Sequence, residues 1–168
     1  MKTLLLTLLL ITGNAFAQND SLTIVAVGEA TLEKDKMTIQ DPYVTGTLTA
    51  AQKSAAMDLV KLLRNDFSFY QKKFFLVEAA ANNSAFRQTT NYEYWNSKGI
   101  RFLGTASVDK AGDSMKVNVV FEDIKNRKQV YNQTETITIA SLRKDGHEMA
   151  NDVYKRIANW LEIIFQLR

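Results

Sequence analysis

The chain has 168 residues, with 21 basic and 18 acidic side chains and a formal net charge of +3. Because these charges are interspersed and form no basic block, they do not indicate a nucleic-acid or anionic-membrane partner. The absence of cysteine excludes thiolate metal sites, iron–sulfur clusters and cysteine nucleophiles, and a single histidine, His147, excludes a site built from several imidazoles.

The first 17 residues have the pattern of a secretory signal peptide. Lys2 supplies the positive charge, residues 4–11 form an apolar run, and Ala15, Phe16 and Ala17 form an A-x-A cleavage signal. The apolar run is too short for a stable membrane anchor, and Gln18, where a lipoprotein has cysteine, cannot carry a lipid. We therefore predict cleavage after Ala17 and an exported, periplasmic protein. Residues 18–168 have the usual length of one domain.

The mature chain begins with a predicted strand. Residues 21–28 are β-branched and apolar, which favours a strand. The following segment, from Glu29 to Gly46, is polar and is predicted to be irregular, with a turn at Asp41 and Pro42.

Residues 47–70 predict the first long helix. Thr49 is a candidate N-cap, and Gln52 three residues later completes a capping-box pattern. Apolar residues then follow at helical spacing: Ala55, Ala56, Leu59, Val60, Leu63 and Phe67. The short apolar run at residues 72–79 predicts a buried strand.

A short helix or turn is predicted at residues 89–99, ending at Gly99. It brings together Tyr92, Tyr94 and Trp95. An exposed cluster of this kind would suit a partner surface, but we favour core packing because both residue types bury well with one polar tip satisfied.

Three strands are predicted next, at residues 100–108, 114–123 and 129–139. Tight turns separate them, which indicates an antiparallel meander. One face of the last strand is almost entirely polar, so that face is solvated or the strand lies at the edge of the sheet.

Residues 141–165 predict a long amphipathic helix. One stripe is apolar and comprises Leu142, Gly146, Met149, Ala150, Val153, Ile157, Trp160, Leu161 and Ile164. The element order predicts an α/β (α+β) two-layer sandwich, in which a mixed five-stranded sheet carries two main helices on one face.

His147 lies on the flank of this stripe, with Asp145, Glu148 and Asp152 nearby in sequence. On a helix, however, its neighbours are three and four residues away, and none of them is a carboxylate. We therefore interpret His147 as a packing and hydrogen-bonding residue rather than a metal ligand or a catalytic group. A partner contact is the second possibility.

No motif for catalysis or cofactor binding is present. The chain lacks the glycine-rich phosphate loops and the G-x-S-x-G elbow, and its acidic residues form no evident carboxylate pair. We therefore expect no catalytic residue, no cofactor and no metal. The alternative is a small periplasmic ligand-binding protein or enzyme with its site in residues 29–46.

The chain resembles the N-terminal domain of TolB, the periplasmic component of the Tol–Pal envelope system. Residues 94–137 are similar to the hairpins of that domain, residues 62–78 to its early helix and the strand after it, and residues 142–157 to its closing helix. The matching positions in the closing helix are Leu142, Arg143, His147, Asp152, Val153 and Tyr154. The chain departs from the family at residues 158–168, which lack its Thr-Gly and further glycine, and we expect a domain without the β-propeller of TolB.

The resemblance implies a stand-alone, non-catalytic domain that acts through protein–protein contacts in envelope maintenance. Similar folds occur in CsgG-like and LpoB-like envelope proteins. The TolB N-terminal tail contacts TolA, which implies a partner-binding role for Gln18, Asn19, Asp20 and Ser21. Contacts carried by the propeller, including those to Pal, are not implied. From the residues themselves, an edge strand at residues 129–139 could also accept a partner strand.

Overall fold

The computed structural model describes residues 34–70, 73–78 and 90–167, all within one unit, Leu32–Arg168. The predicted signal peptide, the strand at residues 21–28 and the candidate partner residues Gln18, Asn19, Asp20 and Ser21 lie outside the described residues.

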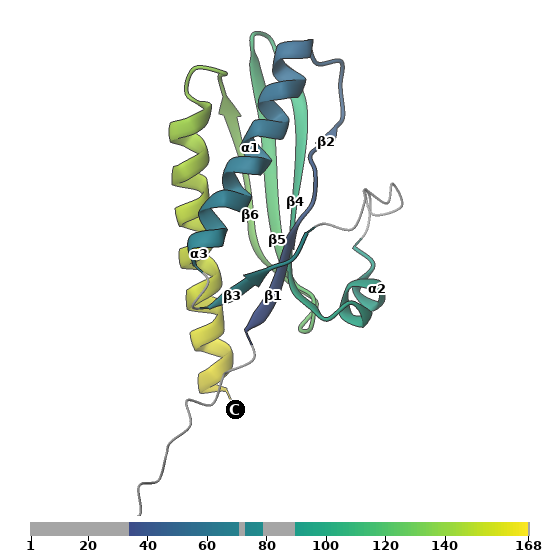
Figure 1. Cartoon of the computed structure of the whole chain (residues 1–168), viewed down its shortest axis with the longest axis vertical. Coiled ribbons are helices and arrows are strands. Elements are labelled where there is room, and N and C mark those ends of the chain that lie inside the picture. Colours follow the sequence, from purple (N-terminus) through teal and green to yellow (C-terminus); the bar gives the residue numbers. More distant parts are fainter. Residues whose placement is uncertain (1–33, 71–72, 79–89, 168) are drawn as a thin grey trace, which may run out of the picture. The chain divides into compact units, whose positions relative to one another are not determined.

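A mixed sheet forms the centre of this unit (Figure 1). Its strands are β1 (Asp35–Ile39), β2 (Tyr43–Val44), β3 (Phe74–Leu76), β4 (Ile100–Ala111), β5 (Ser114–Asp123) and β6 (Lys128–Ile137). The strand order is β3-β1-β4-β5-β6, and β2 pairs with β4. β1 runs parallel to β3 and β4, whereas β4, β5 and β6 form the predicted antiparallel meander.

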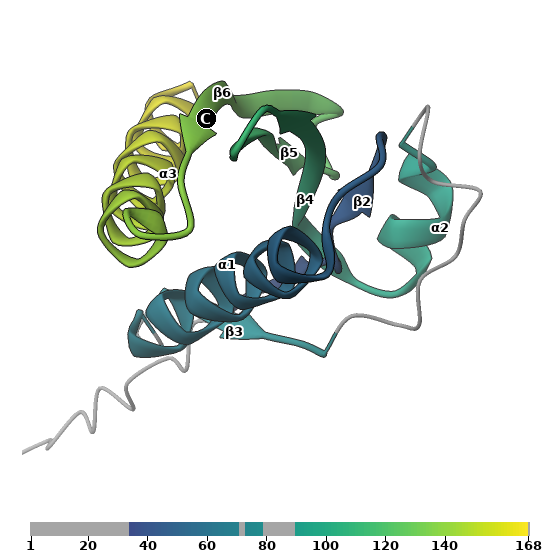
Figure 2. The same cartoon turned by 90° about the horizontal axis from the view of Figure 1, so that it is seen from above.

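Two long helices, α1 (Ala50–Phe69) and α3 (Leu142–Gln166), cover one face of the sheet (Figure 2). The short helix α2 (Tyr92–Ser97) packs beside β4 on the other face. The predicted two-layer α/β sandwich with two main helices on one face is therefore confirmed, but the sheet has six strands in the described residues rather than the predicted five. None of the helices in the described part of the chain is both long and apolar enough to span a membrane.

The prediction that residues 29–46 are irregular is wrong where the structure describes them. β1 and β2 lie in this segment, on either side of the predicted turn at Asp41 and Pro42. Met37 and Ile39 are fully buried because β1 pairs with β3 on one side and β4 on the other. These partners are distant in sequence, so the local pattern around Asp35 and Lys36 gave no sign of them.

The helix α1 begins as predicted. The hydroxyl of Thr49 accepts a hydrogen bond from the Gln52 amide, and the Gln52 side chain accepts one from the Thr49 amide, which completes the capping box. The Gln52 side-chain amide also donates to the carbonyl oxygens of Gly112 and Ser114, at 3.3 and 3.1 Å. One buried glutamine thus fixes the start of α1 against the β4–β5 turn.

The main core lies between the sheet and the two long helices. It contains the predicted apolar faces of α1, β5 and α3, with Phe67 stacked on Phe121 and Tyr70 stacked on Tyr154. Gly104 in β4 leaves room for the Phe121 ring, since a Cβ there would lie 2.7 Å from Phe121 Cζ.

A second, smaller core lies under α2. Trp95 is buried with Ile100, Leu103 and Ile124, and Tyr92 and Tyr94 pack against them. The prediction of core packing for this aromatic cluster is therefore confirmed. Gly99 ends the helix with a φ of 69°, a conformation that favours glycine.

Candidate functional site

His147 has a carboxylate partner on another helix. Its Nδ1 lies 2.7 Å from Oδ2 of Asp66 in α1, and the His147 side chain is 48% exposed. The interpretation of His147 as a hydrogen-bonding flank residue therefore fits the structure, but the partner could not be found from helix spacing because it lies 81 positions away. No group of three or more His, Cys, Asp or Glu residues in the described ranges could hold a metal ion.

Asp123 is a fully buried carboxylate at the end of β5. It accepts five hydrogen bonds, two from the Arg101 guanidinium, two from Asn126 and one from Nε1 of Trp160, at 2.7–3.0 Å. Burial acts to raise the pKa of Asp123, but these hydrogen bonds together outweigh it and hold the pKa below its usual value. The network ties β4, the β5–β6 turn and the second half of α3 together.

A second carboxylate, Asp35 at the start of β1, completes the surroundings of Arg101. Its Oδ1 lies 3.5 Å from NH1 of Arg101. Burial raises the pKa of Asp35, and the charge of Asp123 adds to this, while Arg101 and Lys125 oppose it. Arg101 is thus shared between two carboxylates, with the better geometry toward Asp123.

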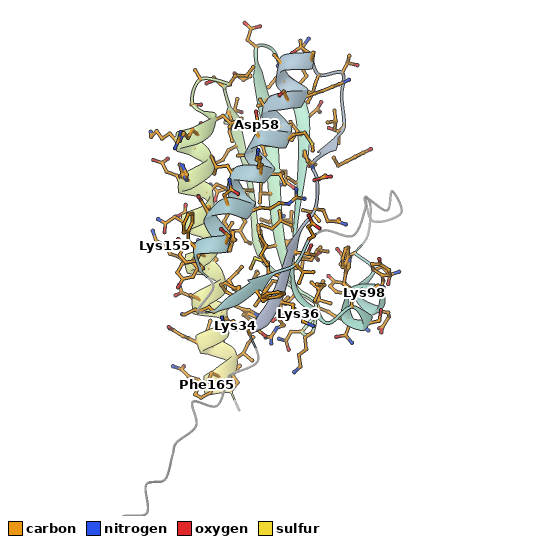
Figure 3. All side chains as sticks on the ribbon, in the orientation of Figure 1. Lys34, Lys36, Asp58, Lys98, Lys155 and Phe165 are labelled. Carbon is orange, nitrogen blue, oxygen red and sulfur yellow. The ribbon has the colours of Figure 1, made fainter. Side chains whose placement is uncertain are left out.

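Beside this network lies a hollow of about 230 Å³ that we name the basic hollow. It is lined by Lys34, Asp35, Lys36, Asn96, Gly99, Ile100, Arg101 and Lys125. Figure 3 shows Lys34, Lys36 and Lys98 at this end of the sheet, away from Asp58 and Lys155 on the two long helices. Its lining holds four cationic side chains against one carboxylate, so the arrangement can attract an anion.

An adjoining hollow of about 390 Å³, the aromatic hollow, shares Asn96 and Lys125 with the first. Its other lining residues are Tyr92, Glu93, Ile124 and Arg127. Arg127 forms an ion pair with Glu93 and lies over the Tyr92 ring. The Tyr92 hydroxyl donates to Glu122 at 2.7 Å, and mainly this hydrogen bond raises the pKa of Tyr92 to about 12.

β6 is an edge strand, which confirms one of the two sequence-based explanations for its polar face. Among the described strands it pairs only with β5, and its ladder is continuous from Tyr131 to Ile137, with a bulge at Val130 near its start. Asn132, Thr134 and Thr136 expose their side chains on the face away from the core. The backbone N–H and C=O groups on the outer side of such a strand are available to another chain.

The segment predicted as an alternative site, residues 29–46, supplies only part of the lining of the basic hollow. Of residues 29–46, Lys34, Asp35 and Lys36 line the basic hollow. Arg101 and Lys125, the other charged residues of that hollow, were not identified from the sequence. Their chain separation hides their proximity, and no motif spacing marks them.

No family model and no curated protein sequence matches this chain. Among solved structures, TolB from Acinetobacter baumannii matches with a TM-score of 0.56 and 16% identity. Lipoprotein GNA1162 from Neisseria meningitidis gives a TM-score of 0.46 at 9% identity, covering 61% of this chain and 79% of that one. The LpoB C-terminal domain from Salmonella enterica gives 0.44 at 11% identity, covering 62% and 82%.

The TolB match covers 76% of this chain but only 29% of TolB. At 16% identity the likeness establishes a fold similar to that part of TolB, without assigning the chain to a family. The α/β two-layer architecture expected from the resemblance is thus found in a solved structure.

Proposed function

We propose that this protein is a non-catalytic interaction domain of the cell envelope, exported to the periplasm, which binds an envelope protein by accepting one of its strands at β6. The observation that carries this proposal is the ten-residue edge of β6. A strand added there would form backbone hydrogen bonds along the edge, and the exposed polar side chains would contact alternate residues of the partner.

The envelope setting is supported by the resemblance to TolB and by the similar fold. The signal-peptide pattern of residues 1–17 supports export, with the domain comprising residues 18–168. We also propose a second partner contact at Gln18, Asn19, Asp20 and Ser21. The support for this contact is the resemblance of these residues to the N-terminal tail of TolB. Identification of the partner will show whether it belongs to a Tol–Pal system or to another envelope complex.

Site-specific photo-crosslinking in cells tests this proposal. A photoreactive residue at Thr134 or Thr136 should crosslink to the same envelope protein, identified by mass spectrometry. The control position is Asp58, which is exposed on α1. Equal crosslinking from Asp58, or none from either β6 position, would contradict binding at this edge.

Two adjacent proline variants then test strand addition itself. Successive residues of a strand direct their N–H groups to opposite sides, so of Thr134 and Glu135 one faces β5 and the other faces outward. Proline at the outward position should abolish the crosslink with little loss of stability, whereas proline at the inward position should destabilise the sheet. Retention of the crosslink in the stable variant would exclude backbone pairing.

A small-ligand protein or enzyme with its site in residues 29–46 remains the second candidate. It is favoured by the position of Lys34, Asp35 and Lys36 in the basic hollow. High affinity of the purified protein for a small anion, independent of β6, would support this candidate over an interaction domain.

A further inference from the structure

We propose that the basic hollow recognises an acidic segment of a partner polypeptide. The choice of a polypeptide rests on the proposed function, but the surface differs from the edge of β6. The two surfaces are connected through the β5–β6 turn, since Lys125 lines the hollow and β6 starts at Lys128.

The first argument is charge that the protein does not neutralise. Lys34, Lys36 and Lys125 are exposed, and none of them forms an ion pair with another residue in the described part of the chain. The carboxylate of the hollow, Asp35, already has Arg101 as its partner. Three ammonium groups therefore surround a space in which a carboxylate would be attracted to all of them.

The second argument is a rigid frame. Nε and NH2 of Arg101 are held by Asp123 at 2.9 Å, so the guanidinium cannot turn away to neutralise the hollow differently. Gly99 contributes no side chain to the wall, and a Cβ there would come within 3.6 Å of the Lys36 ammonium. A site fixed before binding loses less entropy when the ligand arrives.

The third argument concerns the length of the ligand. The basic hollow continues into the aromatic hollow through Asn96 and Lys125. The ion pair of Arg127 with Glu93 neutralises charge in the aromatic hollow, and the partly exposed Tyr92 offers apolar surface there. An extended chain with a carboxylate at one end and an uncharged continuation fits this sequence of surfaces better than an isolated phosphate does.

Fluorescence anisotropy measures the binding of a labelled peptide to the purified protein and tests the proposal. The protein is expressed from the full sequence. The probe is a labelled synthetic peptide with glutamates at one end and threonines along the rest, and its control has glutamine for glutamate. The double variant Lys36→Gln/Lys125→Gln should bind the acidic probe roughly three- to tenfold more weakly than the unsubstituted chain. Lys53→Gln/Lys61→Gln removes the same charge from exposed positions on α1 and should leave binding unchanged.

The outcomes distinguish a specific peptide site in the basic hollow from a general effect of charge. Weaker binding in the first double variant alone, together with no binding of the glutamine peptide, supports the proposal. Equal losses in both double variants indicate net charge rather than a site, and no binding at low salt also overturns it. Competition by inorganic phosphate or by anionic lipid vesicles at lower concentration than by the unlabelled peptide would assign the hollow to another ligand. Because β6 is not varied, failure here leaves the crosslinking test of the proposed function intact.

Discussion

Asp123 connects three segments that are far apart in the sequence. Its carboxylate receives hydrogen bonds from Arg101 in β4, Asn126 in the β5–β6 turn and Trp160 in α3. A buried carboxylate without such donors would be strongly destabilising. Because every donor is present, this side chain fixes the position of the basic hollow relative to α3.

Replacing Asp123 by Asn should lower the free energy of unfolding by about 3 kcal/mol, since Arg101 would lose its buried counter-charge. Urea denaturation at neutral pH measures this loss. Asp58→Asn, exposed on α1, is the control and should change stability by less than about 0.5 kcal/mol. A similar small effect for Asp123→Asn would show that the network contributes little.

The same carboxylate predicts a pH dependence. The folded-state pKa of Asp123 lies below its usual value of 3.8, so its stabilisation is present above that pH and is lost as the pH falls through the lowered pKa. Asp35 has a raised pKa and acts in the opposite direction: its contribution is present below pH 3.8 and is lost as the pH rises through the raised value. As the pH decreases, the free energies of unfolding of the unsubstituted chain and Asp123→Asn should therefore converge. Asp58→Asn, the control, should differ little from the unsubstituted chain at every pH.

His147 should contribute little to stability. Its pair with Asp66 is half exposed on the histidine side, and exposed ion pairs contribute about 0–1 kcal/mol. We expect His147→Ala to unfold with a free energy reduced by less than about 1 kcal/mol and to keep the β6 crosslink. Loss of the crosslink in a folded His147→Ala protein would instead assign His147 to the partner contact.

At the scale of elements, α1 and α3 approach closely at a glycine. A Cβ at Gly146 would lie 3.0 Å from the terminal methyl groups of Leu59 and Leu62. Valine at this position should destabilise the protein by about 1–3 kcal/mol because these side chains would have to move. Alanine should be nearly neutral, since its better helix propensity, worth up to about 1 kcal/mol, offsets a contact with flexible methyl groups. Thermal denaturation of both variants measures these effects. If the valine variant were as stable as the alanine variant, close helix packing would not be the reason for glycine at this position.

The helices and strands that could be predicted are those in which buried apolar residues recur at a regular spacing along the sequence. The stripe of α3 and the alternation of β5 are each set by packing against a single layer, so their periodicity is visible in the sequence. β1 was missed because only three of its five residues are buried, and because their burial comes from pairing with distant strands. The two-residue strand β2 is too short for any periodic pattern.

At the scale of the whole molecule, the candidate sites were harder to predict than the fold. The sequence left two explanations for the polar face of β6, a solvated face or an edge position, because a strand with a polar face cannot be buried on both sides in a sandwich. The basic hollow depends on Lys36, Arg101 and Lys125, which the β1–β4 pairing and the β5–β6 turn bring together. Such a site has no local signature, since each lysine alone looks like an ordinary surface residue.

The proposed envelope function depends on export of the whole protein. We expect the exported protein to begin at Gln18, because Ala15 and Ala17 provide the small residues that precede a cleavage site. Intact mass spectrometry of the periplasmic fraction checks this, and Ala15→Arg should retain the uncleaved form because a large cation replaces one of the two small residues. The control Ala30→Arg lies beyond the leader and should leave cleavage unchanged. Recovery of the protein from the cytoplasm with residues 1–17 intact would remove the basis for an envelope partner, whatever β6 or the basic hollow can bind in isolation.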